Sequence, residues 1–343
     1  MYHGEVMRGF LNFFTRRAAN TLALVLACGA SLSPAAAGDL DAIQSAFDTT
    51  FGTEQRAPRS YGSPFEAQVA ALANAQGGRI GVAALDLSTG RSVAVLGNQP
   101  FPMASTSKVA IVATFLEGVD QGRFRLEDQY PLMIPVPSRK FDGPVAPVRA
   151  GGMYSALNLI EMTITRSDNN ATDALLAVVG GPQAVNRWLR KSGLNDLHID
   201  RDIATLVRDD GAVDPARTVD TRDAATPLAM VRLLSGIYRG EWLSASSRAV
   251  LMGAMERCLT GKRRMRALLP EDARVAHKTG TLYNTSSDVG FIHMPDGRPI
   301  AVAIYVTGQG GKPNRDARIA AIARALYDGY GADGMGLRRT AAR

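Results

Sequence analysis

The chain has 343 residues, of which 46% are hydrophobic, so it can bury a large core in one α/β domain or in two smaller domains. Its formal charge is +7, which predicts a basic surface. No stripe of Lys and Arg interleaved with aromatic residues runs along the sequence, and this argues against nucleic-acid binding.

Residues 1–37 are typical of an export signal peptide. An arginine pair precedes a mostly apolar run over 18–28, and small residues follow up to Ala37, after which we expect cleavage. The run is about half of the roughly 20 residues that a membrane span needs, so we expect no transmembrane span. Two variants stay open, a twin-arginine signal and a lipid anchor on Cys28. The prediction is a protein exported to the periplasm or cell envelope.

The next elements are predicted from apolar spacing. Phe65, Val69 and Leu72 recur at the spacing of a helix, and two apolar stretches flank the turn at 87–90, which is typical of a β-hairpin. In chain order we expect a helix over 40–51, a connector that ends at 63, a helix over 64–75, and a hairpin of 79–86 and 91–96.

The rest of the chain is mostly helical until strands return near its end. Helical periods dominate over 103–265, for example Leu228, Val231 and Leu234. We then expect strands at 274–279, 288–293 and 300–307, a helix over 315–327 and a disordered tail over 329–343. The prediction is one domain over 64–328, whose α/β half is 64–100 and 266–328 and whose helical half, 101–265, is inserted between the strands.

Cysteine and histidine are sparse. Once the leader is removed, Cys258 is the only cysteine, so no internal disulfide is expected. It lies in an apolar, helix-like run over 248–259, which predicts a buried structural thiol rather than a reactive one. The four histidines show no ligand spacing, and we expect no metal site.

Three short motifs carry the chemistry. They are Ser105-Thr106-Ser107-Lys108, Ser167-Asp168-Asn169 and Lys278-Thr279-Gly280. An S-x-x-K pattern alone arises about once by chance in a chain of this size, but all three in this order arise in roughly one chain in a thousand. The combination is therefore informative where each motif alone is not.

The first motif predicts a nucleophile and its base. Ser105 precedes a buried helix, and Lys108 lies one turn later on the same face. Serine becomes a nucleophile only when a base removes its proton, and a buried lysine near a second cation, here Lys278, can lose its own proton and serve as that base. The alternative is that Ser105 caps the helix and Lys108 is a solvated lysine.

The other two motifs predict groups around the serine. Ser167 lies between two helical stretches, where its alternative role is another helix cap, and Asp168 is expected to bond backbone at that turn. The third motif is placed on an edge strand, where Gly280 lets substrate backbone approach closely. Lys278 and the Thr279 hydroxyl can bind a carboxylate.

The chain resembles class A β-lactamases and penicillin-binding proteins, for which these three motifs are the signature. The similarity covers about 65–327, and four further stretches carry it: 101–104, 162–176, 220–223 before Thr226-Pro227, and 275–277. The resemblance implies an α/β fold, an α+β sandwich in which helices flank a five-stranded antiparallel sheet and a mostly helical subdomain is inserted. It also implies a serine acyl-enzyme that needs no cofactor.

The resemblance further assigns roles at the site. Ser167 would pass the proton between Lys108 and the leaving nitrogen, and Asn169 would hold the amide carbonyl of the substrate. Backbone N–H groups of Ser105 and Thr281 would form the oxyanion hole. The carboxylate at the third motif would be the one common to β-lactams and to peptides that end in D-alanine.

One family residue is missing. Class A β-lactamases have a glutamate two residues after an arginine, and it activates the water that frees the acyl-enzyme. The corresponding stretch here is Arg201-Asp202-Ile203, and Ile203 cannot do this. The stretch between Arg201 and Asp223, which match the pair that closes this loop in the family, contains Asp202, Asp209, Asp210 and Asp214. One of them could reach the water, although a solvated acidic loop is the interpretation that we favour.

We therefore carry three hypotheses. The first is a class A-like serine hydrolase, an antibiotic-resistance β-lactamase, that acylates on Ser105 and hydrolyses β-lactams; whether it hydrolyses the acyl-enzyme quickly or slowly stays open. The second is a D-alanyl-D-alanine carboxypeptidase, a penicillin-binding protein that acts on cell-wall peptides. The third is a non-enzymatic receptor for β-lactams or wall fragments. In each case we expect a monomer.

Overall fold

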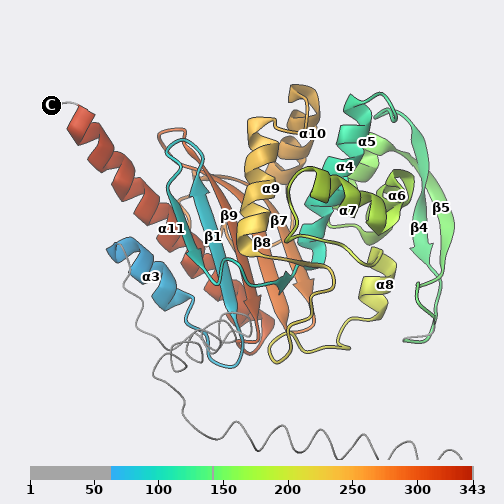
Figure 1. The fold of residues 1–343 in the computed structure, drawn as a ribbon, viewed down its shortest axis with the longest axis horizontal. Coiled ribbons are helices and arrows are strands. Elements are labelled where there is room, and N and C mark those ends of the chain that lie inside the picture. Colours follow the sequence, from blue (N-terminus) through green and yellow to red (C-terminus); the bar gives the residue numbers. More distant parts are fainter. Residues whose placement is uncertain (1–62, 141–142, 342–343) are drawn as a thin grey trace, which may run out of the picture. The chain divides into compact units, whose positions relative to one another are not determined.

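A computed structural model describes residues 63–140 and 143–341. Its main sheet has five antiparallel strands in the order β2-β1-β9-β8-β7 (Figure 1). The strands are β1 Ile80–Asp86, β2 Ser92–Val95, β7 Arg274–Leu282, β8 Thr285–His293 and β9 Pro299–Thr307. This confirms the predicted α/β fold with its five-stranded sheet, and β7 forms one of the two edges.

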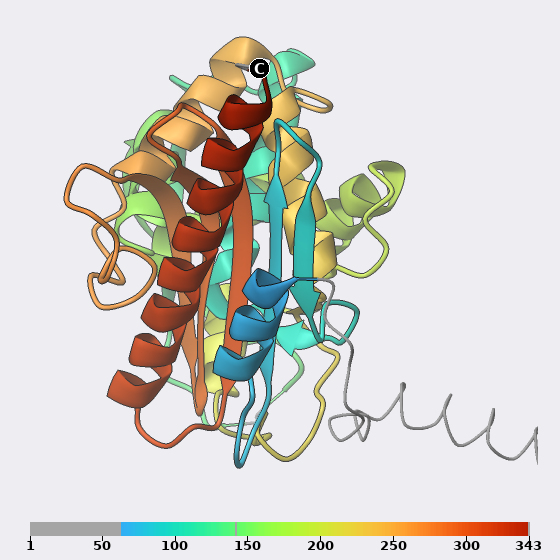
Figure 2. The ribbon, with the colours of Figure 1, turned by 90° about the vertical axis from the view of Figure 1, so that its left-hand side faces the viewer.

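The sheet is covered on both faces, because successive residues of a strand point to opposite sides. Val82 belongs to an apolar cluster with α11 (Lys312–Ala341), next to which α3 (Pro64–Leu72) also packs. Its neighbour Ala83 belongs to a second cluster with α9 (Pro227–Arg239). Figure 2 shows α3 and α11 lying together on the first of these faces. The second face receives the helical half.

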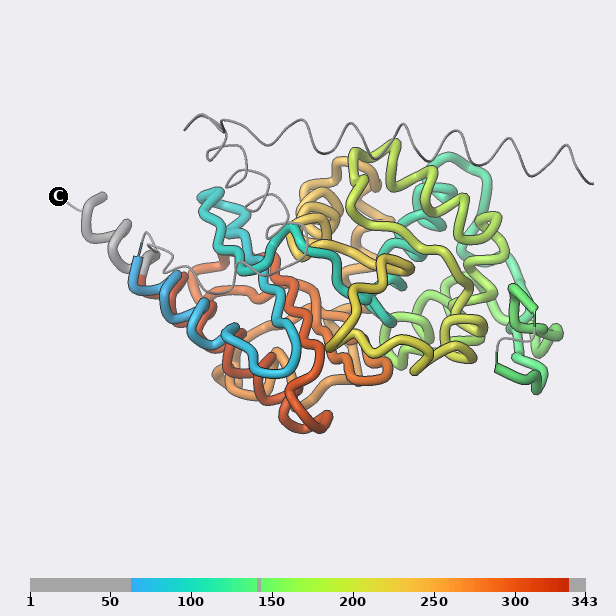
Figure 3. Tube along the Cα trace, turned by 60° about the horizontal axis from the view of Figure 1, so that its bottom comes forward, coloured from blue at the N-terminus to red at the C-terminus, as the bar shows by residue number. Residues whose placement is uncertain are grey.

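The helical half is built around one buried helix, α4. Every residue from Lys108 to Leu116 of α4 is buried, as expected for a helix that is apolar on all sides. Figure 3 shows the green and yellow segments of this half beside the orange strands. Besides α9, its helices are the 3-10 turn η2 Ala104–Ser107, α4 Lys108–Asp120, α5 Ala156–Thr165, α6 Asn169–Val179, α7 Gly181–Lys191, α8 Ile203–Arg208 and α10 Ala245–Glu256.

Two strand pairs within this half are absent from the sequence predictions. β4 (Gln129–Pro135) pairs with β5 (Val148–Ser155), and β3 (Phe101–Pro102) pairs with β6 (Ala224–Ala225). The residues of the β4–β5 hairpin are half-buried or exposed, so no alternation of apolar and polar residues marks it. The shorter pair has only two residues in each strand, too few for a periodic signal.

The predicted disordered tail is wrong in its first residues. Helix α11 continues to Ala341 instead of ending at residue 327. Tyr330 is fully buried, and its hydroxyl lies 3.2 Å from the carbonyl oxygen of Ala84 in β1. Gly329 packs against the Phe65 ring so closely that a larger side chain would not fit. These contacts attach residues 329 and 330 to the fold.

The predicted signal peptide, the helix over 40–51 and Cys28 lie outside the described residues. Within 63–140 and 143–341, none of the helices combines the length and the apolar character that crossing a membrane requires.

Candidate active site

Ser105 lies in the η2 turn that links β3 to α4. The turn is held by its own side chains: the Thr106 hydroxyl donates to the carbonyl of Met103 (2.7 Å), and that of Ser107 donates to the carbonyl of Ala104 (2.9 Å). Ala104 has a φ of 49°, in a region that L-residues rarely adopt. Neither η2 nor α4 has a side-chain cap, so the alternative role of Ser105 as a helix cap is wrong. Its side chain remains free for chemistry.

Lys108 is fully buried, so the alternative of a solvated helix lysine is also wrong. Its Nζ donates to Asn169 Oδ1 (2.6 Å) and to the carbonyl (2.7 Å) and hydroxyl (3.3 Å) oxygens of Ser167. Burial, and then the charge of Lys278, lower the pKa of Lys108 well below its usual value, against the opposing charges of Asp173 and Asp168. The amine is thereby prepared to accept a proton.

Ser167 lies between two amines. Its hydroxyl oxygen accepts from Lys278 Nζ (2.9 Å) as well as from Lys108 Nζ (3.3 Å). Ser167 has a φ of 58°, and the cap of α6 is its neighbour Asp168, which accepts from the Ala171 N–H (2.8 Å). The alternative that Ser167 caps the helix is therefore wrong, and the prediction that Asp168 bonds backbone at this turn is confirmed. The arrangement can pass a proton between the two lysines.

Lys278, Thr279 and Gly280 lie on the edge strand β7, as predicted. Burial lowers the pKa of Lys278 to about 8. The Thr279 hydroxyl lies 2.6 Å from that of Thr260. Packing within the protein requires glycine at position 280, because a Cβ there would lie 2.6 Å from the Met103 carbonyl oxygen. This close approach brings β7 against the turn that carries Ser105.

Arg264 is a site residue that the sequence analysis missed. Its guanidinium is buried and donates to the Thr281 hydroxyl (2.6 Å) and to the carbonyls of Gly280 (2.7 Å) and Ser287 (2.9 Å), while it pairs with Asp316 (2.7 Å). It thus fixes the end of β7 and orients the hydroxyl of Thr281. No pattern in the sequence separates Arg264 from Lys262, Arg263 and Arg266, which are exposed in the structure.

The loop after α7 is closed by the predicted pair. Arg201 Nε lies 2.6 Å from Asp223 Oδ2, which confirms the pairing. Ile203 is buried, and its N–H donates to Asp173 Oδ1 (2.7 Å), while the Ala204 N–H donates to Asp173 Oδ2 (2.8 Å). Burial raises the pKa of Asp173 to about 7. This carboxyl group, also missed by the sequence analysis, joins α6 to the start of α8 close to Lys108.

Asp202, Asp209, Asp210 and Asp214 each have a partner in or beside the loop. Asp202 caps α8 by accepting from the Thr205 N–H (2.7 Å), and Asp209 pairs with Arg208 (2.8 Å). Asp210 accepts from the N–H of Tyr283 (2.8 Å), and Asp214 accepts from the side chain of Asn284 (2.8 Å). These contacts hold the acids in or beside the loop.

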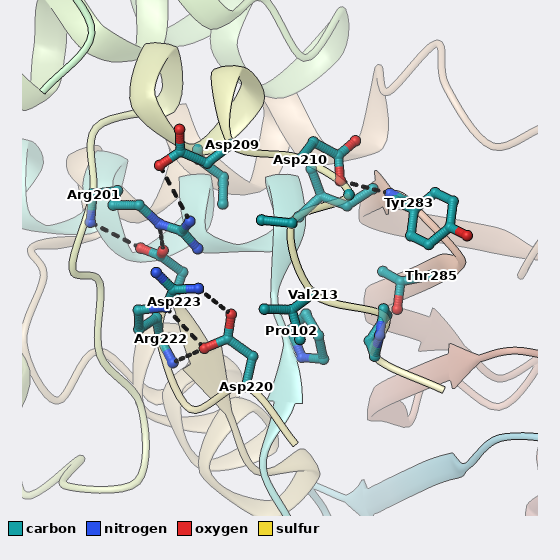
Figure 4. A pocket seen from close by; sticks show the side chains of 15 residues that line it. Pro102, Arg201, Asp209, Asp210, Val213, Asp220, Arg222, Asp223, Tyr283 and Thr285 are labelled. Carbon is teal, nitrogen blue, oxygen red and sulfur yellow. Dashed lines mark hydrogen bonds and ion pairs between the residues drawn. The ribbon is translucent and has the colours of Figure 1, made fainter. Parts of the chain in front are cut away.

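A pocket of about 50 Å³ lies between this loop and the β7–β8 turn (Figure 4). Arg201, Asp209, Asp220 and Asp223 converge on one side of it, and Tyr283 lies on the other. The lining of this pocket does not include Ser105, nor the side chains of Lys108, Ser167, Asn169 and Lys278, so the pocket is separate from the candidate site.

The candidate site is thus assembled by η2, α4, the turn before α6, and β7. It brings together Ser167, Asn169 and the two lysines through direct hydrogen bonds, beside Ser105. Among residues 63–140 and 143–341, no three His, Cys, Asp or Glu side chains are grouped in a way that could hold a metal ion. The arrangement suits acyl transfer through a serine hydroxyl.

Comparison with known proteins gives a consistent family. A profile described as the β-lactamase enzyme family matches residues 64–330. The chain is 32% identical to β-lactamase CTX-M-25 of Escherichia coli over 269 residues, which cover 77% of this chain and 88% of that protein. It is 32% identical to a β-lactamase of Streptomyces fradiae over 249 residues, which cover 72% of this chain and 79% of that protein.

Solved structures agree with this. A β-lactamase from Chitinophaga pinensis superposes with a TM-score of 0.68 at 28% identity, covering 78% of this chain and all of that one (100%). An ancestral class A β-lactamase, that of the last common ancestor of Gram-negative bacteria, superposes with a TM-score of 0.66 at 36% identity. The match covers 77% of this chain and 99% of that one.

Proposed function

The chain belongs to the class A β-lactamase family of serine hydrolases, and on this basis we propose that it opens β-lactam rings by forming an acyl-enzyme on Ser105. One observation carries the proposal: the buried amine of Lys108 is hydrogen-bonded to Ser167 and Asn169, and its pKa is lowered by burial and by Lys278. A buried amine with a lowered pKa, one turn after a serine, is a group that can take the serine proton during the attack.

In the proposed acylation, each of these groups has one role. Lys108 accepts the Ser105 proton while the serine oxygen attacks the lactam carbonyl, and the backbone N–H groups of Ser105 and Thr281 receive the developing negative charge. Ser167 then gives its proton to the lactam nitrogen as the C–N bond breaks, and recovers one from Lys108, to which it is hydrogen-bonded. Asn169 holds the amide carbonyl of the substrate side chain.

The carboxylate of the substrate is received at β7. Lys278 carries the positive charge, although it is buried, and the Thr279 hydroxyl supplies a donor beside it. Arg264 supports this edge by donating to the Thr281 hydroxyl and to the Gly280 carbonyl. Penicillins, cephalosporins and peptides that end in D-alanine all present a carboxylate at this position.

We further propose that the acyl-enzyme is hydrolysed slowly. The side chain at the position of the family glutamate is that of Ile203, which is buried and has no group that can accept a proton. A general base commonly contributes about 10²–10⁴-fold, so its loss favours accumulation of the acyl-enzyme. The acids of the loop support the same proposal, since their contacts are to backbone, to arginines and to Asn284.

A chromogenic cephalosporin tests this proposal. We expect a rapid release of about one equivalent of product per enzyme, followed by a slow steady rate. Ser105→Ala should abolish covalent labelling by a fluorescent penicillin, with Ser92→Ala, at an exposed position of β2, as the control that keeps the label. Persistence of the label in Ser105→Ala would exclude Ser105 as the nucleophile.

The buried Ile203 also favours a second candidate, a D-alanyl-D-alanine carboxypeptidase, because such an enzyme does not require the missing glutamate. Release of D-alanine from a diacyl-L-lysyl-D-alanyl-D-alanine peptide would support it, and undetectable release would exclude it. If the protein is labelled by penicillin but neither turns over cephalosporin nor releases D-alanine, the receptor hypothesis remains.

Export is part of the proposal. The leader sequence supports delivery to the periplasm or cell envelope. Fractionation of cells that express the whole chain should recover the protein outside the cytoplasm, in a form shortened by 37 residues for a soluble product or beginning at a lipidated Cys28 for an anchored one.

A further inference from the structure

A second pocket, of about 500 Å³, lies between the end of β5, one side of α5 and the segment that follows α10. No residue of the three signature motifs lines it, so it is separate from the candidate active site. Pockets of about 300–1,000 Å³ are of the size that holds a small molecule. The pocket therefore has room for a ligand of its own.

The pocket lies on the side of α5 that faces away from the core. Asn158, Glu161, Met162 and Thr165 line it, and their spacing of three or four residues places them on one side of the helix. The buried core residues of α5 occupy the other side, as Leu159 does. No other helix covers the lined side where the pocket opens, which leaves these four residues to a ligand.

Two contacts hold the wall opposite α5 in place. The backbone N–H of Leu259 donates to the Thr165 carbonyl (2.9 Å). Arg257 forms a two-pronged ion pair with Glu161, in which the Nε–Oε1 distance is 3.0 Å and the Nη2–Oε2 distance is 2.8 Å. The pocket is thus formed without a ligand, so binding does not have to order its walls.

Apolar side chains are exposed at the rim of the pocket. Leu259 is 61% exposed and Tyr154 is 38% exposed, and the half-buried Met162 adds a third apolar side chain to the lining. Exposed large apolar side chains that gather around one pocket are typical of a binding site. A ligand with an apolar body would remove this surface from water.

The pocket carries one positive charge in excess. Its ionisable lining residues are Glu161, Arg166 and Arg257, and the first and the last neutralise each other. Arg166 is exposed, and over residues 63–140 and 143–341 its guanidinium has no hydrogen-bond or ion-pair partner. The planar fork of an arginine matches a carboxylate, and the Asn158 amide can donate a further hydrogen bond. The charge therefore favours a ligand with one carboxylate.

The pocket adjoins the candidate active site along the chain. Arg166 directly precedes Ser167, and Leu259 directly precedes Thr260, whose hydroxyl lies 2.6 Å from that of Thr279. A ligand in the pocket would contact the neighbours of these residues without taking the place of a substrate. The two sites can therefore be filled at the same time.

We propose that this pocket binds a small carboxylate with an apolar body, whose acidic group pairs with Arg166 and whose body covers Tyr154 and Leu259. The site goes beyond the proposed β-lactam chemistry and does not require Ser105.

Calorimetric titration of the full chain with 2-naphthoate tests the proposal without β-lactam activity. We expect a Kd of about 0.1–1 mM, as for other ligands of this size. The neutral 2-naphthamide keeps the rings and lacks the charge, so it should bind about 10-fold more weakly. Undetectable binding of 2-naphthoate, or equal binding of the acid and the amide, would overturn the proposal.

Two pairs of variants locate the site. Arg166→Gln should weaken the binding of 2-naphthoate about 10-fold, whereas Arg187→Gln, at an exposed position of α7 outside the pocket, should not. Leu259→Ser should weaken it about 5-fold, and Leu268→Ser, also exposed and outside the pocket, is the matched control. The assignment is wrong if Arg166→Gln binds 2-naphthoate as the parent does.

The same titration on protein already acylated by penicillin separates this inference from the proposed function. Unchanged binding of 2-naphthoate supports a separate pocket. Loss of binding would mean that 2-naphthoate enters the candidate active site, which contradicts the inference. If penicillin does not acylate the protein, the proposed function fails, while the naphthamide comparison and the variants still decide the inference.

Discussion

Lys108 is fully buried, and we propose it as the base that takes the Ser105 proton. Lys108→Met keeps the length of the side chain but removes the amine, so acylation should slow about 10²–10⁴-fold. The measurement is the second-order rate of labelling by a fluorescent penicillin, with circular dichroism to verify folding. Lys262→Met removes an exposed lysine and serves as the control. Labelling of Lys108→Met at the parent rate would mean that another group takes the proton.

Asp173 makes stability depend on pH. Burial raises its pKa to about 7, whereas the unfolded chain loses this proton at about pH 4. The folded protein therefore holds one more proton between these values, and its stability relative to the unfolded chain falls as pH rises through that window.

The Asp173→Asn variant has no group at position 173 that titrates, while all its other carboxyl groups are the same as those of the parent protein. The free energy of unfolding of the parent minus that of Asp173→Asn should fall by up to about 4 kcal/mol from pH 4 to pH 8. Urea unfolding at several pH values measures this difference. A constant difference would show that Asp173 is ionised throughout.

Residues in short motifs could be predicted, and residues placed by the tertiary fold could not. Ser105 and Lys108 are three positions apart, so the helical repeat alone puts them together. Arg264 reaches Thr281, and Asp173 reaches Ile203, only after the chain has folded, and no local pattern separates these residues from other charged ones. The sequence showed that Ile203 replaces the family glutamate, but only the structure shows which groups surround it.

At the scale of elements, the contact between β7 and the η2 turn positions the serine against its carboxylate-binding strand. A methyl group at residue 280 would meet the Met103 carbonyl at 2.6 Å and the Ser287 hydroxyl at 2.4 Å. Gly280→Ala should therefore push η2 away from β7, destabilise the protein by about 1–3 kcal/mol and slow acylation.

Thermal unfolding and the labelling rate measure the two effects of Gly280→Ala. Gly152→Ala is the matched control, because a Cβ there meets only the Tyr154 ring at 3.4 Å. If both variants behave alike, the approach of the turn to the strand is not limiting for acylation.

Elements with a strong local period were the ones that the sequence predicted. The β1–β2 hairpin and α9 follow from their spacing of apolar residues, and both are present. The β4–β5 hairpin has neither period, because its residues are half-buried or exposed with no regular alternation. The predicted helix ends too early, at residue 327 in place of Ala341, because the contacts that hold Tyr330 are made with β1 and α3, which are distant in sequence.

At the scale of the whole described chain, Tyr330 connects the last helix to the first elements. Its ring lies 5.2 Å from the Phe65 ring in an edge-to-face contact, and its hydroxyl reaches the Ala84 and Arg91 carbonyls. Tyr330→Ala should cost about 3–5 kcal/mol of unfolding free energy, as for other buried aromatic residues.

Tyr330→Phe keeps the ring and loses only the hydroxyl, so its cost should be about 1 kcal/mol. Denaturant unfolding of both variants separates ring packing from hydrogen bonding. Equal and small costs would mean that the chain beyond residue 328 contributes little, as the predicted tail had assumed.

The pairing of β1 with β9 has a consequence for the order of folding. The Arg79 N–H donates to the Thr307 hydroxyl across 228 positions of the chain, and the strands that complete the sheet are among the last to leave the ribosome. Such distant pairing raises contact order and slows folding. A nascent chain that lacks β9 leaves the edge of β1 that faces β9 without a partner, so the sheet cannot be completed until residues 299–307 have been synthesised.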